Sequence, residues 1–172
     1  MEMTDICPAQ TWAALEEDIH QRFRLNARVY DNKGFSFTRH VTWGNRICPA
    51  IKAHPQGVSG ICSLAHTAMA AQARDTRATV IEECDAGLIK ICVPVFVNDL
   101  FVGVAGGCGA LSPGGEVDSF LVEKTAGLPE DQTAALSSGI PEMDEATAAN
   151  AAQYIEERVA ELLAAYLKGK KN

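Results

Sequence analysis

Apolar residues recur every three or four positions in several stretches of the chain. In the first stretch they are Trp12, Leu15, Ile19 and Phe23, and acidic or amide side chains fill the other positions. This spacing is typical of an amphipathic helix with one buried face. The predicted helices cover residues 11–24, 61–74, 116–125 and 144–168, with a shorter one after Pro129.

A period of two replaces the helical period in the middle of the chain. Ile89, Ile91, Val93, Val95 and Val97 alternate with other residues, which predicts a strand. The turn dipeptide at 98–99 then predicts a hairpin with a second strand over 100–105. A proline within the first strand places it at a sheet edge or at a bulge.

Weaker strand patterns cover 27–30, 35–38 and 79–83. The segment 31–34 between the first two holds Asn and Gly, which tolerate positive φ, so the pair predicts a further hairpin. Residues 39–60 contain Pro49, Pro55 and several glycines, and they are predicted to be irregular. A segment of this length without regular structure usually has a function.

The final predicted helix has a heptad pattern. Its apolar residues are separated by four, three, four, three and four positions: Ala148, Ala152, Ile155, Val159, Leu162 and Tyr166. Two interpretations stay open. The seam packs on the chain's own sheet, or it pairs with a second copy to form a homodimer.

Length and charge narrow the class of protein. The chain has 172 residues, of which 47% are hydrophobic, and this suits a single domain over 1–172 with a core of about 10–167. The net charge of -7 argues against nucleic acid or an anionic membrane as a partner. The sequence has no apolar export signal and no membrane-length apolar run, so we expect a soluble, cytoplasmic protein.

The six cysteines are the most informative residues for function. Cytoplasmic thiols stay reduced, so a group of them indicates metal binding, redox chemistry or a lined pocket. Cys48, Cys62, Cys84 and Cys108 are the candidate ligands for zinc or an iron–sulfur cluster. Their wide spacing is also consistent with thiols that simply pack in the core.

Other residues complete the candidate site. His66 lies one helical turn after Cys62, so the two share a helix face. A thiol-dependent enzyme that uses Cys62 or Cys108 is an alternative function, as is a purely structural protein. The residues expected to contact a cofactor or ligand are Trp43, His66, Met69 and Cys92.

The order of several short motifs resembles the PocR-type sensory domain. These motifs are Ile47-Cys48, Cys62 at a helix start, Cys84–Leu88, Val93–Val97 and Val102–Gly107. The resemblance covers about residues 10–167 and includes the long last helix. Two positions depart from the family pattern: Asp85 stands where His is common, and Cys108 stands where Gln is expected.

The resemblance implies an α+β, PAS/GAF-like fold in which helices flank a central antiparallel sheet. It also implies a non-catalytic sensor that binds a small molecule and signals to a partner in trans. The family's cysteine positions correspond to Cys48, Cys62 and Cys84. The additional Cys108 favours a metal or cluster, so the ligand class stays open between an organic molecule, zinc and an iron–sulfur cluster with a redox-sensing role.

Overall fold

The computed structural model describes residues 1–170. Its centre is a four-stranded antiparallel sheet with the strand order β1-β4-β3-β2. The strands are β1 (Asn26–Asp31), β2 (Val80–Glu83), β3 (Ile89–Val97) and β4 (Leu100–Ala110). The predicted hairpin is confirmed, because β3 pairs with β4 through a turn at Asn98-Asp99. Pro94 lies beyond the residues that pair with β2, so its missing N–H costs the sheet no hydrogen bond on that side.

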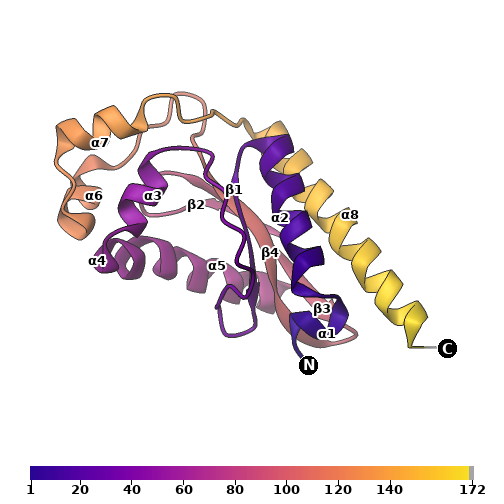
Figure 1. The fold of residues 1–172 in the computed structure, drawn as a ribbon. Coiled ribbons are helices and arrows are strands. Elements are labelled where there is room, and N and C mark those ends of the chain that lie inside the picture. Colours follow the sequence, from indigo (N-terminus) through magenta and orange to yellow (C-terminus); the bar gives the residue numbers. More distant parts are fainter. Residues whose placement is uncertain (171–172) are drawn as a thin grey trace.

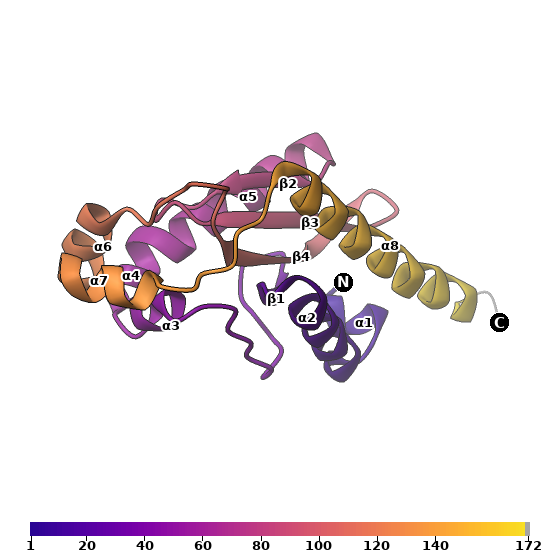
Figure 2. The same ribbon diagram turned by 90° about the horizontal axis from the view of Figure 1, so that it is seen from above.

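Helices cover both faces of the sheet (Figure 1). They are α1 (Met3–Ile6), α2 (Ala9–Phe23), α3 (Ile47–Lys52), α4 (Pro55–Gly57), the π-helix η1 (Val58–Cys62), α5 (Ser63–Thr76), α6 (Ser119–Ala126), α7 (Glu130–Ser137) and α8 (Glu145–Gly169). The helices α2 and α8 lie side by side on one face, and α5 packs on the other. The short helices α3, α4, α6 and α7 gather at one end of the sheet, and α8 extends past the other (Figure 2).

The largest part of the core lies between the sheet and the pair α2 and α8. Trp12 and Ile19 of α2, Ile155 of α8 and Ile91 of β3 are buried there in one cluster. The Trp12 indole N–H donates to the Met3 carbonyl at 2.9 Å, so α1 is fixed to α2. The helical spacing of apolar residues in the first predicted helix therefore marks the face that packs on the sheet.

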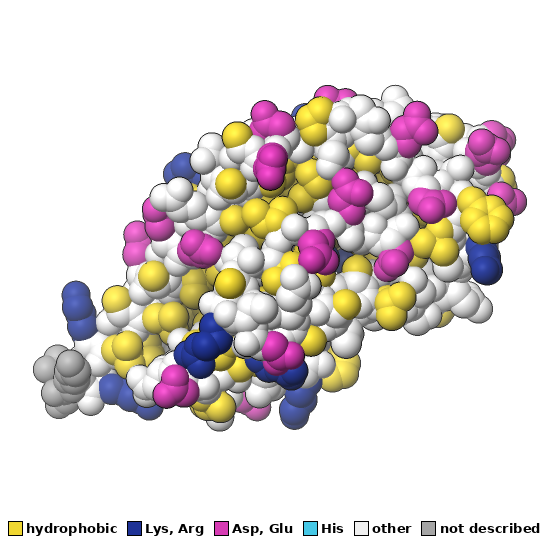
Figure 3. Space-filling view, turned by 180° about the vertical axis from the view of Figure 1, so that it is seen from behind, with side chains coloured by type: hydrophobic (Ala, Val, Ile, Leu, Met, Phe, Trp, Pro, Cys, Tyr) yellow, Lys and Arg dark blue, Asp and Glu magenta, His cyan; other side chains and the backbone are white. Residues whose placement is uncertain are grey.

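The heptad seam of α8 packs on the chain's own sheet along its first half. Ala148, Ala152, Ile155 and Val159 are all buried in the cluster with β3. Later residues of α8 are less covered, and Leu167 is 41% exposed. Figure 3 shows apolar side chains near this end of the molecule. The homodimer stays a prediction, and most of the seam on which it was based is occupied within the chain.

Two predictions about the segment after β1 are wrong. Residues 35–38 form no strand; only an isolated bridge joins Ser36 to Tyr30. Residues 47–60, predicted to be irregular, are largely helical. Pro49 lies in the first turn of α3 and Pro55 is the first residue of α4, positions where a missing N–H costs no helical hydrogen bond.

The fold class is confirmed. The chain is α+β, with a central antiparallel sheet, helices on its faces and a long C-terminal helix. Within residues 1–170 no helix has the length and apolar character needed to cross a membrane.

Candidate ligand-binding cavity

A cavity lies between the sheet and the helices α3, η1 and α5. Its volume is about 40 Å³, which is enough for about three water molecules. Apolar side chains form much of its wall, among them Ile51, Ile61 and Leu88.

The structure brings four of the six thiols to this cavity. Cys48 comes from α3, Cys62 from the end of η1, Cys84 from the turn after β2, and Cys108 from β4. The other two lie elsewhere: Cys7 packs against the α2–α8 cluster, and Cys92 is buried beside Met69. The four thiols are 14 to 60 residues apart in sequence, and only the fold makes them neighbours.

A β-bulge shapes one wall of the cavity. Lys90 pairs with Cys108 and Ile89 pairs with Ala110, so Gly109 is the extra residue of β4. Gly109 has a φ of 103°, which favours glycine. A bulge bends its strand and redirects the side chains beside it. Here the residues on either side of the bulge are Cys108, which lines the cavity, and Ala110, which is in the core.

The buried amide of Asn45 fixes this bulge to α3. Its Nδ2 donates to the Gly109 carbonyl at 2.7 Å and to the Cys48 sulfur at 3.4 Å. Its Oδ1 accepts the Cys48 backbone N–H at 2.8 Å. One side chain therefore sets the distance between β4 and α3, and it places the Cys48 and Cys108 walls relative to each other.

The turn between β2 and β3 positions Cys84. The Cys84 N–H donates to the Leu88 carbonyl at 2.8 Å, and the Gly87 N–H donates to the Cys84 carbonyl at the same distance. Gly87 has a φ of 81°, and a Cβ there would lie 2.6 Å from the Glu116 carbonyl oxygen. The Cys84–Leu88 sequence is thus a tight turn that needs glycine and directs a thiol into the cavity.

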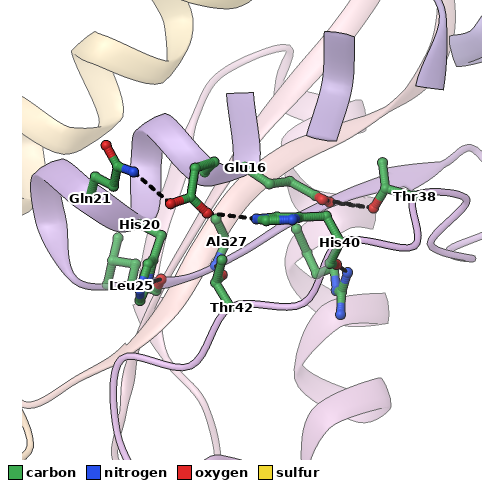
Figure 4. Close-up of polar contacts among 10 residues, drawn as sticks. Glu16, His20, Gln21, Leu25, Ala27, Thr38, His40 and Thr42 are labelled. Carbon is green, nitrogen blue, oxygen red and sulfur yellow. Dashed lines mark hydrogen bonds and ion pairs between the residues drawn. The ribbon is translucent and has the colours of Figure 1, made fainter. Parts of the chain in front are cut away.

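A strap of residues 36–46 leads from β1 to α3 and is held by polar contacts to α2 and β1 (Figure 4). The fully buried carboxylate of Glu16 accepts the Thr38 hydroxyl at 2.7 Å and the Val29 N–H at 2.8 Å. Burial raises the pKa of Glu16, although these hydrogen bonds oppose the rise. The Ala27 N–H donates to the Thr42 hydroxyl at 3.1 Å, and these bonds replace a strand ladder.

Lys90 brings a charge to the cavity wall. Its side chain is only 7% exposed, and its ammonium nitrogen lies 5.6 Å from the centre of the Tyr30 ring, which also lines the cavity. Tyr30 in turn stacks on His66, with ring centres 3.9 Å apart. Neither ring nitrogen of His66 has a hydrogen-bond partner among residues 1–170. His66 is therefore not positioned to orient or deprotonate Cys62.

Burial raises the pKa values of three of the cavity thiols. Burial raises the pKa of Cys48 to about 12 and that of Cys62 to about 11, and it also raises the pKa of Cys84. Burial lowers the pKa of His66 to about 4, helped by the positive charges of Lys90 and Lys52. A reactive cysteine needs a lowered pKa, so the raised pKa values of these three thiols do not favour them as nucleophiles.

The residues expected to contact a ligand lie outside the cavity wall. Trp43 is 38% exposed, with the Lys52 ammonium 5.3 Å from its ring centre. His66, Met69 and Cys92 are buried and are not among the residues that line the cavity. Lys90 and Tyr30 were not predicted from the sequence, whereas Asn45 was one of several residues of site-lining type in the segment 39–60. The family-type turn before β3 was a sequence signal near Lys90, and nothing local distinguished Tyr30.

The metal prediction gains no support from the geometry. Within residues 1–170 no three His, Cys, Asp or Glu side chains are arranged to hold one metal ion. A buried lysine beside the thiols would also repel a cation. The cavity wall offers thiols, two ammonium groups and apolar surface, a lining that suits a small molecule.

An antiparallel sheet with a cavity between one face and its helices is an arrangement suited to small-molecule binding domains. The sequence matches the family described as "Sensory domain found in PocR" over residues 5–165. The chain therefore belongs to the PocR sensory-domain family, as the motif order predicted. The searches of curated proteins and of solved structures give no match.

Proposed function

We propose that the chain binds a small organic molecule in the cavity lined by Cys48, Cys62, Cys84 and Cys108, and that binding is its sensory event. One observation carries the proposal. The cysteines that mark the family resemblance come from separate elements and line the same cavity. A wall of thiols and aliphatic side chains with two charged groups, Lys52 and Lys90, suits a small, largely apolar ligand.

The strand β3 offers a route from the cavity to α8. Lys90 lies on the cavity side of β3, whereas Ile89 and Ile91 pack in the cluster with α8. A ligand that moves or fixes Lys90 acts on the same strand that supports the last helix. We infer that α8 passes the signal to a partner, either a second copy of the chain or a separate output protein.

The test is to fill the cavity. Ala65 of α5 lines it and is 8% exposed, while Ala68 is exposed on the same helix. Ala65→Phe puts a ring into the cavity, and Ala68→Phe is the matched control. The probes are alcohols, diols, aldehydes, carboxylates and amides of two to five carbons. Binding is measured by thermal shift and by isothermal titration calorimetry.

We expect at least one probe to bind the wild type and the Ala68→Phe variant but not the Ala65→Phe variant. Circular dichroism establishes that both variants are folded. Equal binding by Ala65→Phe would place the site elsewhere, and no binding of any probe to the wild type would contradict this ligand class. For the signalling route, binding should slow amide hydrogen exchange in β3 and in residues 145–160 of α8.

A further inference from the structure

The charged residues of the cavity wall have one sign. The chain carries a net charge of -7, yet the two charged residues that line the cavity are both lysines, Lys52 and Lys90. No aspartate or glutamate among residues 1–170 lines this cavity. In an acidic protein this distribution makes the cavity a local positive site.

The two lysines differ in what surrounds them. Lys52 is partly exposed, and its ammonium lies over the Trp43 ring. Lys90 is 7% exposed, and its ammonium has no hydrogen bond or ion pair in the described part of the chain. Glu82 lies opposite Lys90 on β2, but its side chain is exposed and the two form no ion pair. The contact that Lys90 does make is with the face of the Tyr30 ring.

An ammonium group buried in this way is costly. Transfer of a charge from water into a protein interior costs several kcal/mol unless a counter-charge and hydrogen bonds compensate for it. Burial disfavours the charged form of Lys90, but the neighbouring Tyr30, Cys92 and Cys108 favour it, and the pKa of Lys90 is raised overall. Lys90 therefore stays a charged ammonium on the cavity wall, and no carboxylate lines the cavity beside it in the described part of the chain.

We infer that the ligand is a small monoanion with a short apolar body, and that its carboxylate or an equivalent oxyanion pairs with Lys90. This inference rests on the proposed function and adds the ligand's charge to it. Of the two lysines only Lys90 is buried, and its single ammonium matches a single negative charge, whereas Lys52 is partly exposed and lies over the Trp43 ring. The volume of about 40 Å³ limits the ligand to a few non-hydrogen atoms.

The experiment compares three probes of nearly equal size: propionate, propanamide and 1-propanol. Each is titrated into the wild type, Lys90→Met and Lys52→Met, with binding followed by calorimetry and by ligand-observed NMR. Lys90→Met keeps the length and apolar stem of the side chain and removes the charge. Lys52→Met is the matched control for loss of one positive charge at the edge of the cavity.

We expect propionate to bind the wild type at least about tenfold more tightly than propanamide does. Lys90→Met should weaken propionate binding on the order of thirtyfold or more, because removal of one partner of a buried charge pair has an effect of this size. Lys52→Met should weaken it less than about threefold, as expected for an exposed charge. If a variant fails to fold, the comparison of propionate with propanamide on the wild type still tests the inference.

Two results would overturn the inference. One is binding of propanamide or 1-propanol to the wild type as tight as that of propionate, with Lys90→Met unchanged. The cavity would then be a site for neutral molecules, and the proposed function would survive. The other is a wild type that binds neutral probes but no carboxylate. Failure of the proposed function is recognised separately, by ligand binding that persists in Ala65→Phe.

Discussion

The bulge at Gly109 gives the sharpest test of how the cavity is built. In Gly109→Ala a Cβ would lie 2.4 Å from Asn26 Nδ2 and 2.7 Å from Asn45 Nδ2. Both amides are fixed: Asn26 accepts the Gly44 N–H at 2.7 Å, and Asn45 holds Cys48 and Gly109 itself. Neither can move aside without losing a hydrogen bond.

The expected cost has two parts. A non-glycine residue at a positive φ costs about 1–2 kcal/mol. Displacing the two amides disturbs two or three hydrogen bonds worth about 1 kcal/mol each. Gly109→Ala should therefore lower the free energy of unfolding by roughly 3–5 kcal/mol in total. For a chain of this size that corresponds to a fall in Tm of about 6–20 °C.

Gly114 supplies the matched control. Its φ is 73°, and a Cβ there would meet nothing within 4 Å. Gly114→Ala should cost the strain alone, about 1–2 kcal/mol. The free energy of unfolding of both variants is measured by urea titration followed by circular dichroism. A loss in Gly109→Ala no larger than that in Gly114→Ala would refute the argument that Asn45 holds the bulge rigidly against α3.

Three other predictions concern groups around the cavity and α8. Because burial lowers the pKa of His66 to about 4 in the folded state, the unfolded chain binds more protons between pH 4 and about 6.5. Stability should fall as the pH drops through this range, and His66→Phe should flatten that slope in urea titrations. Because burial raises the pKa of Cys48 to about 12, stability should fall as the pH rises above about 9, and Cys48→Ala should reduce that dependence. Ile155→Ala should cost about 2–5 kcal/mol, whereas Leu167→Ala, at an exposed position, should cost less than about 0.5 kcal/mol. A larger effect for Leu167→Ala that depends on protein concentration would indicate a dimer through the end of α8.

Periodicity predicted the elements whose apolar side chains share one face. The alternation over 89–97 and the seams of α2 and α8 correspond to real buried faces. The prediction of a strand at 35–38 was wrong because this segment makes its hydrogen bonds to Glu16, which is distant in sequence. The turn before it does form, since Asp31 accepts the N–H groups of Lys33 and Phe35 at 2.9 Å. The next residues then bond to Glu16 of α2 instead of continuing along β1.

The cavity was only partly accessible to sequence reasoning. The number of cysteines indicated a site, but their spacing gave no indication that four of them line the same cavity. Lys90 was missed because alternation assigns it to a solvent-facing side of β3. The strand is in fact covered on both sides, since α8 packs on one and the α3–α5 segment lies over the other. A period of two shows which residues share a face of the sheet, but it does not show whether that face is exposed to solvent.

Three departures from local preference border this cavity: a glycine bulge in β4, a π-turn before α5 and a lysine in the buried part of β3. Each of them costs folding free energy, and such conflicts are expected at functional sites. At Lys90 the requirements of folding and of ligand binding can be tested separately. Burial disfavours its ammonium, whereas Tyr30, Cys92 and Cys108 favour it, and the pKa of Lys90 is raised overall. Because these effects oppose each other, Lys90→Met should unfold at about the same urea concentration as the wild type, although it binds propionate more weakly. A clear loss of stability in this variant would mean that Lys90 serves the fold of the free protein, and the case for an anionic ligand would then fail.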